Sequence, residues 1–150
     1  MIGLFESALI TAIFASTIRG TTPILLAALG EAYAERSGLL NLGIEGMMVA
    51  GAFSSFAVAL KLDSLLSGFG FAAVVGLTLA LVFGILTIIL GVNQIVVGLA
   101  LTIFSHSMCS FLHRVIFGNQ FPILFGAGET TEIPLLSRVP IFGQAFFNQH

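Results

Sequence analysis

The sequence predicts an all-α protein: a polytopic transmembrane helical bundle of about five membrane segments, one of them broken or re-entrant near residues 35–60. Hydrophobic residues make up 57% of the 150 positions, charged residues only 8%, and the mean hydropathy is +1.11. A typical soluble domain contains about 25% charged residues. The apolar runs are long and continuous, whereas a β-barrel would show short alternating segments. These observations exclude a soluble globular domain.

The expected membrane segments follow from the apolar runs and the breaks between them. They lie at about residues 2–18, 22–35, 39–60, 67–90 and 94–117, followed by an extramembrane loop at about 118–146. The first two are short for a crossing of roughly 20 residues. Between them, the stretch from Arg19 to Pro23 combines a charge, a glycine and a proline, which predicts an interruption of the helix. The start is interpreted as a retained helix, because it carries Glu6 and lacks the positive charge of a secretory signal.

The last residues have a different character. Three prolines (Pro122, Pro134 and Pro140) exclude a long regular helix there and favour short pieces in a solvated loop. From Phe146 the sequence turns apolar again, as at the approach to another crossing. We therefore expect the chain to be the N-terminal part of a longer protein.

Two helical faces are predicted to pack against protein rather than lipid. In the fourth segment, small residues recur every four positions, which predicts a helix-packing ladder of Ala72, Gly76, Ala80 and Gly84. In the fifth segment, a polar stripe repeats at spacings of four and three. Its members are Gln94, Gly98, Thr102, Ser105 and Cys109. His106 lies beside the stripe and is interpreted as an interhelical hydrogen-bond partner rather than a ligand.

The stretch from Ser37 to Gly51 is the candidate functional segment. It carries Asn41, Glu45 and four glycines within an apolar sequence, and an intramembrane ionisable group suggests function. For Glu45 a structural role is favoured and is compatible with lining a pathway, since a carboxylate near a helix N-terminus is stabilised by the helix dipole. The residues predicted to line a substrate pathway are Asn41, Glu45, Asn93, Gln94, Thr102 and Ser105. No catalytic residue, metal site or cofactor is expected.

Four stretches of the sequence resemble a known family. They are Thr-Pro-Ile-Leu-Leu-Ala-Ala-Leu-Gly-Glu (22–31), Glu-Arg-Ser-Gly-Leu-Leu-Asn-Leu-Gly-Ile-Glu-Gly-Met-Met (35–48), Gly-Val-Asn-Gln-Ile-Val-Val-Gly-Leu-Ala-Leu (91–101) and Ile-Pro-Leu-Leu-Ser-Arg-Val-Pro-Ile-Phe-Gly-Gln (133–144). These stretches resemble permease subunits of ABC importers for simple sugars and nucleosides, on the nucleoside and guanosine branch.

The resemblance implies that the chain is a partial transmembrane permease domain in the cell inner (plasma) membrane. It implies a transport subunit rather than an enzyme, moving a nucleoside or simple sugar by alternating access. The implied partners are a second permease subunit, cytoplasmic ATPase subunits that hydrolyse ATP, and an extracytoplasmic substrate-binding protein. The lipid bilayer surrounds the complex, and no nucleic acid is involved.

The resemblance also implies an orientation in the membrane. It places the N-terminus and Arg36 inside, with Arg19, Lys61, Arg114 and Arg138 outside. The distribution of these charges, read by the positive-inside rule, favours the opposite arrangement. We expect the family orientation.

Two other functions are compatible with the residues. One is a secondary transporter or channel, in which a discontinuous helix carries Glu45 as a proton- or cation-linked group. The other is a membrane assembly subunit without a substrate of its own. The secondary transporter predicts transport driven by an ion gradient alone and loss of that coupling in Glu45→Gln. Substitutions at Asn41, Glu45 and Gln94 would separate the assembly subunit from the importer, because an assembly subunit depends on the ladder and not on these polar residues.

Overall fold

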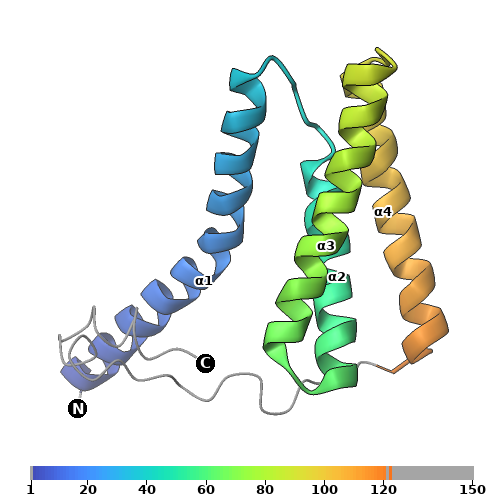
Figure 1. The fold of residues 1–150 in the computed structure, drawn as a ribbon. Coiled ribbons are helices and arrows are strands. Elements are labelled where there is room, and N and C mark those ends of the chain that lie inside the picture. Colours follow the sequence, from blue (N-terminus) through green and yellow to red (C-terminus); the bar gives the residue numbers. More distant parts are fainter. Residues whose placement is uncertain (1, 121, 123–150) are drawn as a thin grey trace. The chain divides into compact units, whose positions relative to one another are not determined.

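The computed structural model describes residues 2–120 and 122, and every long regular element in this part of the chain is a helix. The elements are α1 (Ile2–Arg36), α2 (Ile44–Leu62), α3 (Leu65–Gly84), the short π-helix η1 (Ile85–Ile89) and α4 (Gln94–Phe117) (Figure 1). Four stretches are long and apolar enough to cross a membrane: Ala12–Arg36, Ile44–Leu62, Leu65–Ile89 and Gln94–Phe117. The predicted all-helical membrane fold is confirmed.

The interruption expected between residues 19 and 23 does not occur, because α1 is one helix of 35 residues with Pro23 inside it. Proline removes one backbone donor and bends a helix, and α1 changes direction along its length (Figure 1). Hydroxyl groups supply local donors here. Thr17 Oγ1 donates to the Ile13 carbonyl, and Thr22 Oγ1 donates to the Ile18 carbonyl over 2.7 Å.

The chain divides into two compact units at Ala28. Residues 29–124 form one unit, which contains the end of α1 and all of α2, α3, η1 and α4. The earlier part of α1 belongs to the other unit and is described by itself. The candidate site lies within the unit of residues 29–124. Apart from its first residues, the predicted loop at 118–146 lies outside the described residues.

Helices α2 and α3 form a tight antiparallel hairpin. α2 ends where Asp63 adopts a left-handed conformation with φ of 47°, and the Ser64 hydroxyl caps α3 by accepting from the Ser67 amide. Gly68 allows the two backbones to approach, because a Cβ atom there would lie 2.7 Å from the Ser55 carbonyl oxygen. Close backbone approach of this kind holds helices together in lipid, where burial of apolar surface gives no driving force.

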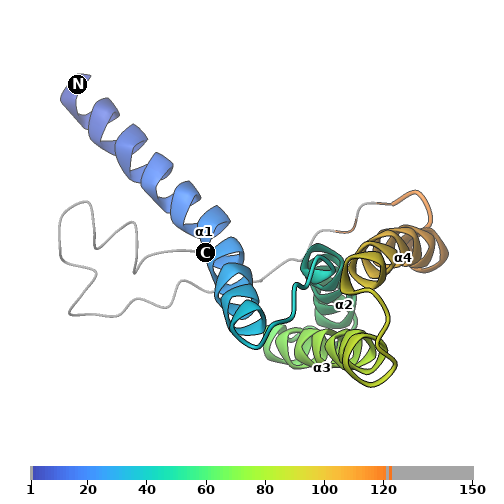
Figure 2. The same ribbon diagram turned by 90° about the horizontal axis from the view of Figure 1, so that it is seen from above.

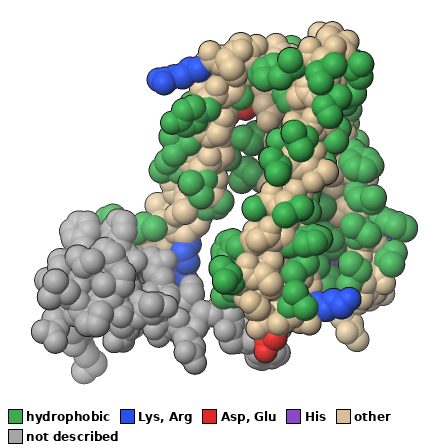
Figure 3. Space-filling view, in the orientation of Figure 1, with side chains coloured by type: hydrophobic (Ala, Val, Ile, Leu, Met, Phe, Trp, Pro, Cys, Tyr) green, Lys and Arg blue, Asp and Glu red, His purple; other side chains and the backbone are tan. Residues whose placement is uncertain are grey.

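Helix α4 packs on α2 in the same direction, so the three helices cluster side by side (Figures 1 and 2). The buried centre is small and consists of Phe83, Val97 and Leu101. Most large apolar side chains are instead exposed, and green apolar surface covers much of the helices in Figure 3. Such extensive apolar exposure is what a lipid or protein neighbour would cover.

Candidate functional site: the segment between α1 and α2

Residues 37–43 leave the helical path between α1 and α2. α1 ends in a glycine turn: Gly38 has φ of 84°, its amide donates to the Glu35 carbonyl, and the Leu39 amide donates to the Ala34 carbonyl. This pattern satisfies the last carbonyls of α1, and the positive φ favours glycine. The discontinuity predicted from the glycines and polar residues is therefore present.

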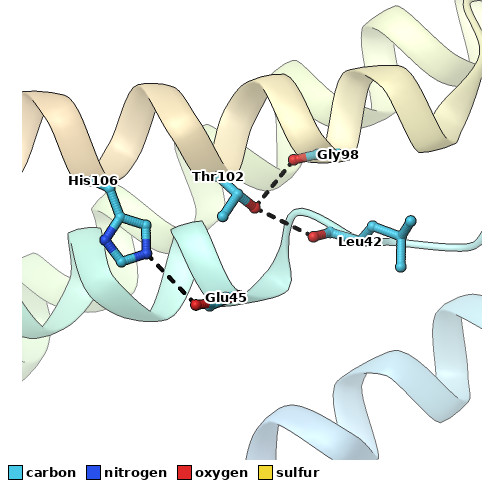
Figure 4. A network of polar contacts seen from close by, with 5 residues as sticks. All are labelled: Leu42, Glu45, Gly98, Thr102 and His106. Carbon is cyan, nitrogen blue, oxygen red and sulfur yellow. Dashed lines mark hydrogen bonds and ion pairs between the residues drawn. The ribbon is translucent and has the colours of Figure 1, made fainter.

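Side chains from two helices hold the backbone of the segment. The Leu40 amide donates to Gln94 Oε1 and the Asn41 amide donates to Glu31 Oε1, each over 2.8 Å. Thr102 Oγ1 donates to the Leu42 carbonyl over 3.2 Å and also to the Gly98 carbonyl over 3.1 Å (Figure 4). We call Glu31, Gln94 and Thr102 the anchoring side chains. These side chains bond backbone groups of the segment. A membrane interior offers no water to such groups, so non-helical backbone is tolerated there only where protein groups bond it.

Asn41 then shapes the start of α2. Its Oδ1 accepts from the Gly43 amide over 3.1 Å, and its Nδ2 approaches Met47 Sδ at 3.8 Å. An asparagine side chain bonded to the backbone two residues later makes a compact turn. This turn leads directly into Gly43, which is the N-cap of α2. Both polar atoms of the Asn41 side chain therefore contact groups of the protein itself, at Gly43 and Met47.

The beginning of α2 lies directly against the backbone of α4. A Cβ atom at Gly46 would lie 2.6 Å from Thr102 Cα, and one at Gly98 would lie 2.8 Å from the Gly43 nitrogen. All three glycines, Gly43, Gly46 and Gly98, are buried. Side chains at these positions would force the two helices apart, so the glycines set the distance at which Thr102 reaches Leu42.

Glu45 and His106 form an ion-pair contact across this interface. His106 Nε2 lies 3.6 Å from Glu45 Oε1, and Figure 4 shows the two side chains reaching toward each other from α2 and α4. The side chains remain 73% exposed at Glu45 and 51% exposed at His106. Glu45 also stands in the first turn of α2, where the helix dipole favours a negative charge. His106 thus contacts a residue of another helix at a separation longer than a hydrogen bond, and its role as an interhelical hydrogen-bond partner stays a prediction.

Four of the six predicted pathway residues gather at the segment: Asn41, Glu45, Gln94 and Thr102. The other two do not. Asn93 caps α4, since its Oδ1 accepts from the Ile95 and Val96 amides at 2.9 and 3.3 Å. Ser105 is buried, with 2% of its surface exposed, and lines an apolar groove. That these residues meet a substrate stays a prediction.

Glu31 belongs to the site, and in the sequence it stands out because it forms an i, i+4 like-charge pair with Glu35, which is unfavourable unless Arg36 or another helix compensates. Beside Glu35 and Arg36, its charge was equally consistent with a solvated helix end. Its Oε1 accepts from Asn41, while its Oε2 is buried and has no hydrogen-bond partner among the described residues. Only the fold brings Glu31 to an amide ten residues later. The like-charge pair with Glu35 was the signal that the sequence offered, and it did not reveal which group Glu31 would bond.

The predicted ladder on α3 begins one turn after Gly68, the residue at which α3 approaches the backbone of α2 most closely. Ala72 lies near Gly51, because a Cβ atom at Gly51 would be 4.0 Å from Ala72 Cβ. A Cβ atom at Gly76, by contrast, would meet nothing within 4 Å in the described part of the chain. The tight approach is at Gly68, four residues before Ala72 on the same face. A packing role for Gly76, Ala80 and Gly84 stays a prediction.

A small cavity of about 370 Å³ adjoins the segment on the side of Gln94. Its walls combine apolar and polar groups. They are Gly38, Leu39, Thr87, Val92, Asn93, Gln94 and Ile95. The cavity therefore places Asn93 and Gln94 beside open space as well as in structural bonds. Across the described residues, no group of three or more His, Cys, Asp or Glu residues is arranged to hold a metal ion.

Together these features define a multi-pass helical membrane protein with a non-helical segment held by side chains inside the bundle. The chain belongs to the family described as the permease component of the branched-chain amino acid transport system, which matches residues 13–134. Membership and the four apolar helices indicate a multi-pass protein of the cell inner membrane. The resemblance to transporter permeases stated from the sequence is confirmed.

Three curated proteins are similar to this chain. A putative glucose ABC transporter permease protein of Haloferax volcanii is 36% identical over 138 residues, covering 88% of this chain and 40% of that protein. A nucleoside ABC transporter permease protein of Lactococcus lactis is 30% identical, covering 91% and 45%. A guanosine ABC transporter permease protein of Bacillus subtilis is 29% identical, covering 93% and 46%. The chain thus spans less than half the length of each, and no solved structure matches it.

Proposed function

We propose that the chain is part of the membrane-spanning permease subunit of an ATP-driven importer, which moves a nucleoside or a simple sugar by alternating access. The observation that carries this proposal is the family match over residues 13–134. The relatives named for glucose, nucleoside and guanosine transport suggest the substrate class. The complete importer would contain a second permease subunit, ATPase subunits that perform the hydrolysis, and an extracytoplasmic substrate-binding protein.

The anchored segment supports a transport role on physical grounds. Many secondary transporters place binding groups at discontinuous helices near the bilayer midplane, where helix ends and unwound backbone offer polar groups to a substrate. Here Glu45 and His106 form a polar, exposed pair at the start of α2, next to the Thr102–Leu42 bond. Hydroxyl-rich substrates such as sugars and nucleosides would find both hydrogen-bond donors and acceptors on this surface.

The test is uptake of radiolabelled nucleosides and sugars by cells that carry the complete set of importer genes. We expect uptake of one of these classes, and we expect a variant of the ATPase partner that cannot hydrolyse ATP to abolish it. Uptake that continues unchanged with the disabled ATPase would overturn the proposal.

The same assay distinguishes the secondary-transporter alternative, for which the exposed Glu45–His106 pair is the relevant observation. That alternative predicts uptake driven by an ion gradient alone and loss of the ion dependence in Glu45→Gln. For the importer, Glu45→Gln leaves the energy source unchanged, whatever it does to the apparent affinity for substrate.

A further inference from the structure

The small cavity beside Gln94 lies where three parts of the chain meet. One wall comes from the glycine turn at Gly38 and Leu39, one from the π-helix η1 through Thr87, and one from the start of α4. Its volume of about 370 Å³ falls within the range of about 300–1,000 Å³ that small-molecule sites occupy. The cavity therefore has the size of a site for a monosaccharide or for one half of a nucleoside.

The wall that follows α3 departs from the regular α-helix. The Leu90 amide donates to the Ile85 carbonyl, five residues earlier, over 3.0 Å, which is the bonding of a π-helix. Such π-turns are rare and occur frequently at functional sites. Thr87 belongs to this turn, and its hydroxyl donates to the Phe83 carbonyl over 2.8 Å. Because a hydroxyl oxygen also accepts, this wall offers the cavity a hydrogen-bond acceptor.

Two side-chain amides in the cavity wall use their oxygens for the fold but not their nitrogens. Asn93 Oδ1 caps α4, and Gln94 Oε1 accepts from the Leu40 amide. Within the part of the chain that the structure describes, no hydrogen bond joins Asn93 Nδ2 or Gln94 Nε2 to another residue. Each primary amide nitrogen carries two donors. These nitrogens are therefore available to donate to a solute in the cavity.

The charge of the wall determines which solutes suit it. Each of the described residues that line the cavity is uncharged, and Glu35 and Arg36, shortly before Gly38, are exposed and lie outside the lining. An amino acid carries an ammonium and a carboxylate group, and taking such charges out of water without partners is costly. A nucleoside or a sugar instead presents uncharged hydroxyl or carbonyl oxygens, which match amide donors. The wall thus favours a neutral solute over an amino acid.

We propose that this cavity is a binding subsite for an uncharged solute, whose hydroxyl or carbonyl oxygens accept hydrogen bonds from the side-chain amides of Asn93 and Gln94. The inference rests on the proposed transport function and narrows its substrate to a neutral nucleoside or sugar, although the family is described by branched-chain amino acid transport. Asn93 and Gln94 serve the fold through their oxygens and the solute through their nitrogens.

Protection of a cysteine from alkylation tests whether the cavity is occupied. In the complete importer, reconstituted in nanodiscs and freed of other cysteines, a single cysteine replaces Val92, which lines the cavity and is 41% exposed. The matched control replaces Val96, which is 60% exposed and lies outside the lining. Guanosine or glucose at ten times its dissociation constant should slow alkylation of Val92→Cys by N-ethylmaleimide roughly tenfold. Alkylation of Val96→Cys should not change, and leucine should protect neither position.

Two amide-to-acid substitutions separate the binding role from the structural one. Asn93→Asp and Gln94→Glu keep the oxygens that hold the Ile95 and Leu40 amides but replace the nitrogen donors. Each substitution should raise the guanosine or glucose concentration that gives half-protection by roughly three- to tenfold, the effect of losing one hydrogen bond. The temperature of thermal unfolding should stay near that of the parent protein, because the structural bonds remain.

Protection by leucine, equal protection at the two valine positions, or unchanged protection in both acid variants would overturn the proposal. The absence of protection in an importer that transports guanosine or glucose would do the same. Because uptake is measured separately, that result contradicts the cavity alone and leaves the proposed transport function intact. An importer that moves neither nucleosides nor sugars contradicts the proposed function and the cavity proposal with it.

Discussion

At the scale of single residues, three glycines determine how close α2 and α4 lie. A Cβ atom at Gly46 or Gly98 would meet backbone atoms at 2.6 and 2.8 Å, so a methyl group has no space to enter there, whereas one at Gly43 would first meet the Asn41 side chain at 3.2 Å. Gly76, in the interior of α3, faces open space instead. The sequence does not distinguish the two kinds of glycine, because the difference lies in the atoms that the fold places beside each one.

Gly46→Ala should therefore destabilise the protein, although alanine is the better helix former. The added Cβ would sit 2.6 Å from Thr102 Cα, and overpacking of this kind costs about 1–3 kcal/mol. Gly76→Ala should be neutral or stabilising by up to about 1 kcal/mol, because only helix propensity changes. Thermal unfolding of the purified permease in detergent measures both. An equal shift in the two variants would contradict the close approach of α2 to α4.

At the scale of elements, the segment of residues 37–43 depends on partners from elsewhere in the chain. Its glycines, Asn41 and Glu45 predicted the discontinuity from the sequence, because each is unusual in a membrane-spanning helix. The bonds to Gln94 and Thr102 join residues 54 and 60 positions apart. No local pattern reveals such pairings, so the sequence identified most of the residues but not what each one bonds.

The continuity of α1 was mispredicted for a related physical reason. Proline in an aqueous loop and proline in a membrane helix look the same in the sequence. In lipid, leaving the helical path exposes several backbone groups, whereas keeping it sacrifices a single donor at Pro23. Keeping the helical path costs less free energy, and α1 therefore continues from Ile2 to Arg36.

Removing the anchoring acceptors should loosen the segment. Glu31→Leu and Gln94→Leu each leave a part-buried amide without a partner, which costs about 1–3 kcal/mol. Because the two amides belong to consecutive residues, the double variant should cost less than the sum of the single ones. Thermal unfolding of the four proteins in this cycle gives the coupling.

Two further variants control this experiment. Glu35→Leu, one turn after Glu31 and exposed, should change stability by no more than about 0.5 kcal/mol. Glu31→Gln retains an acceptor for the Asn41 amide and should lie closer to the wild type than Glu31→Leu. Strictly additive losses in the cycle would mean that the amides of Leu40 and Asn41 are held independently.

At the scale of the whole molecule, the helix directions restrict the topology. α2 and α4 run in the same direction, so Lys61 and Arg114, in the last turn of each, lie at the same end of the bundle. Arg36 ends α1 on the other side of the anchored segment from Lys61. The predicted grouping of Lys61 with Arg114, and their separation from Arg36, is compatible with this arrangement. Which end faces the cytoplasm stays a prediction.

Cysteine labelling of intact cells measures the orientation. In a Cys109→Ser background, single cysteines at Lys61 and Arg114 should react with a membrane-impermeant maleimide added outside. A cysteine at Arg36 should react only after the cells are opened. Opposite accessibility of Lys61 and Arg114 would contradict the parallel packing of α2 and α4, whereas exchange of inside and outside for all three would reverse only the orientation.

The anchoring bonds also couple the movements of the helices that they join. The amides of Leu40 and Asn41 are neighbours along the chain, but one is held by α4 and the other by the end of α1. A slide of either helix by one turn, about 5.4 Å, would break one bond while the other still held the adjoining peptide unit. The bonds therefore tie α4, the end of α1 and the first turn of α2 to one segment, so a displacement of α4 would strain the attachments at the other two.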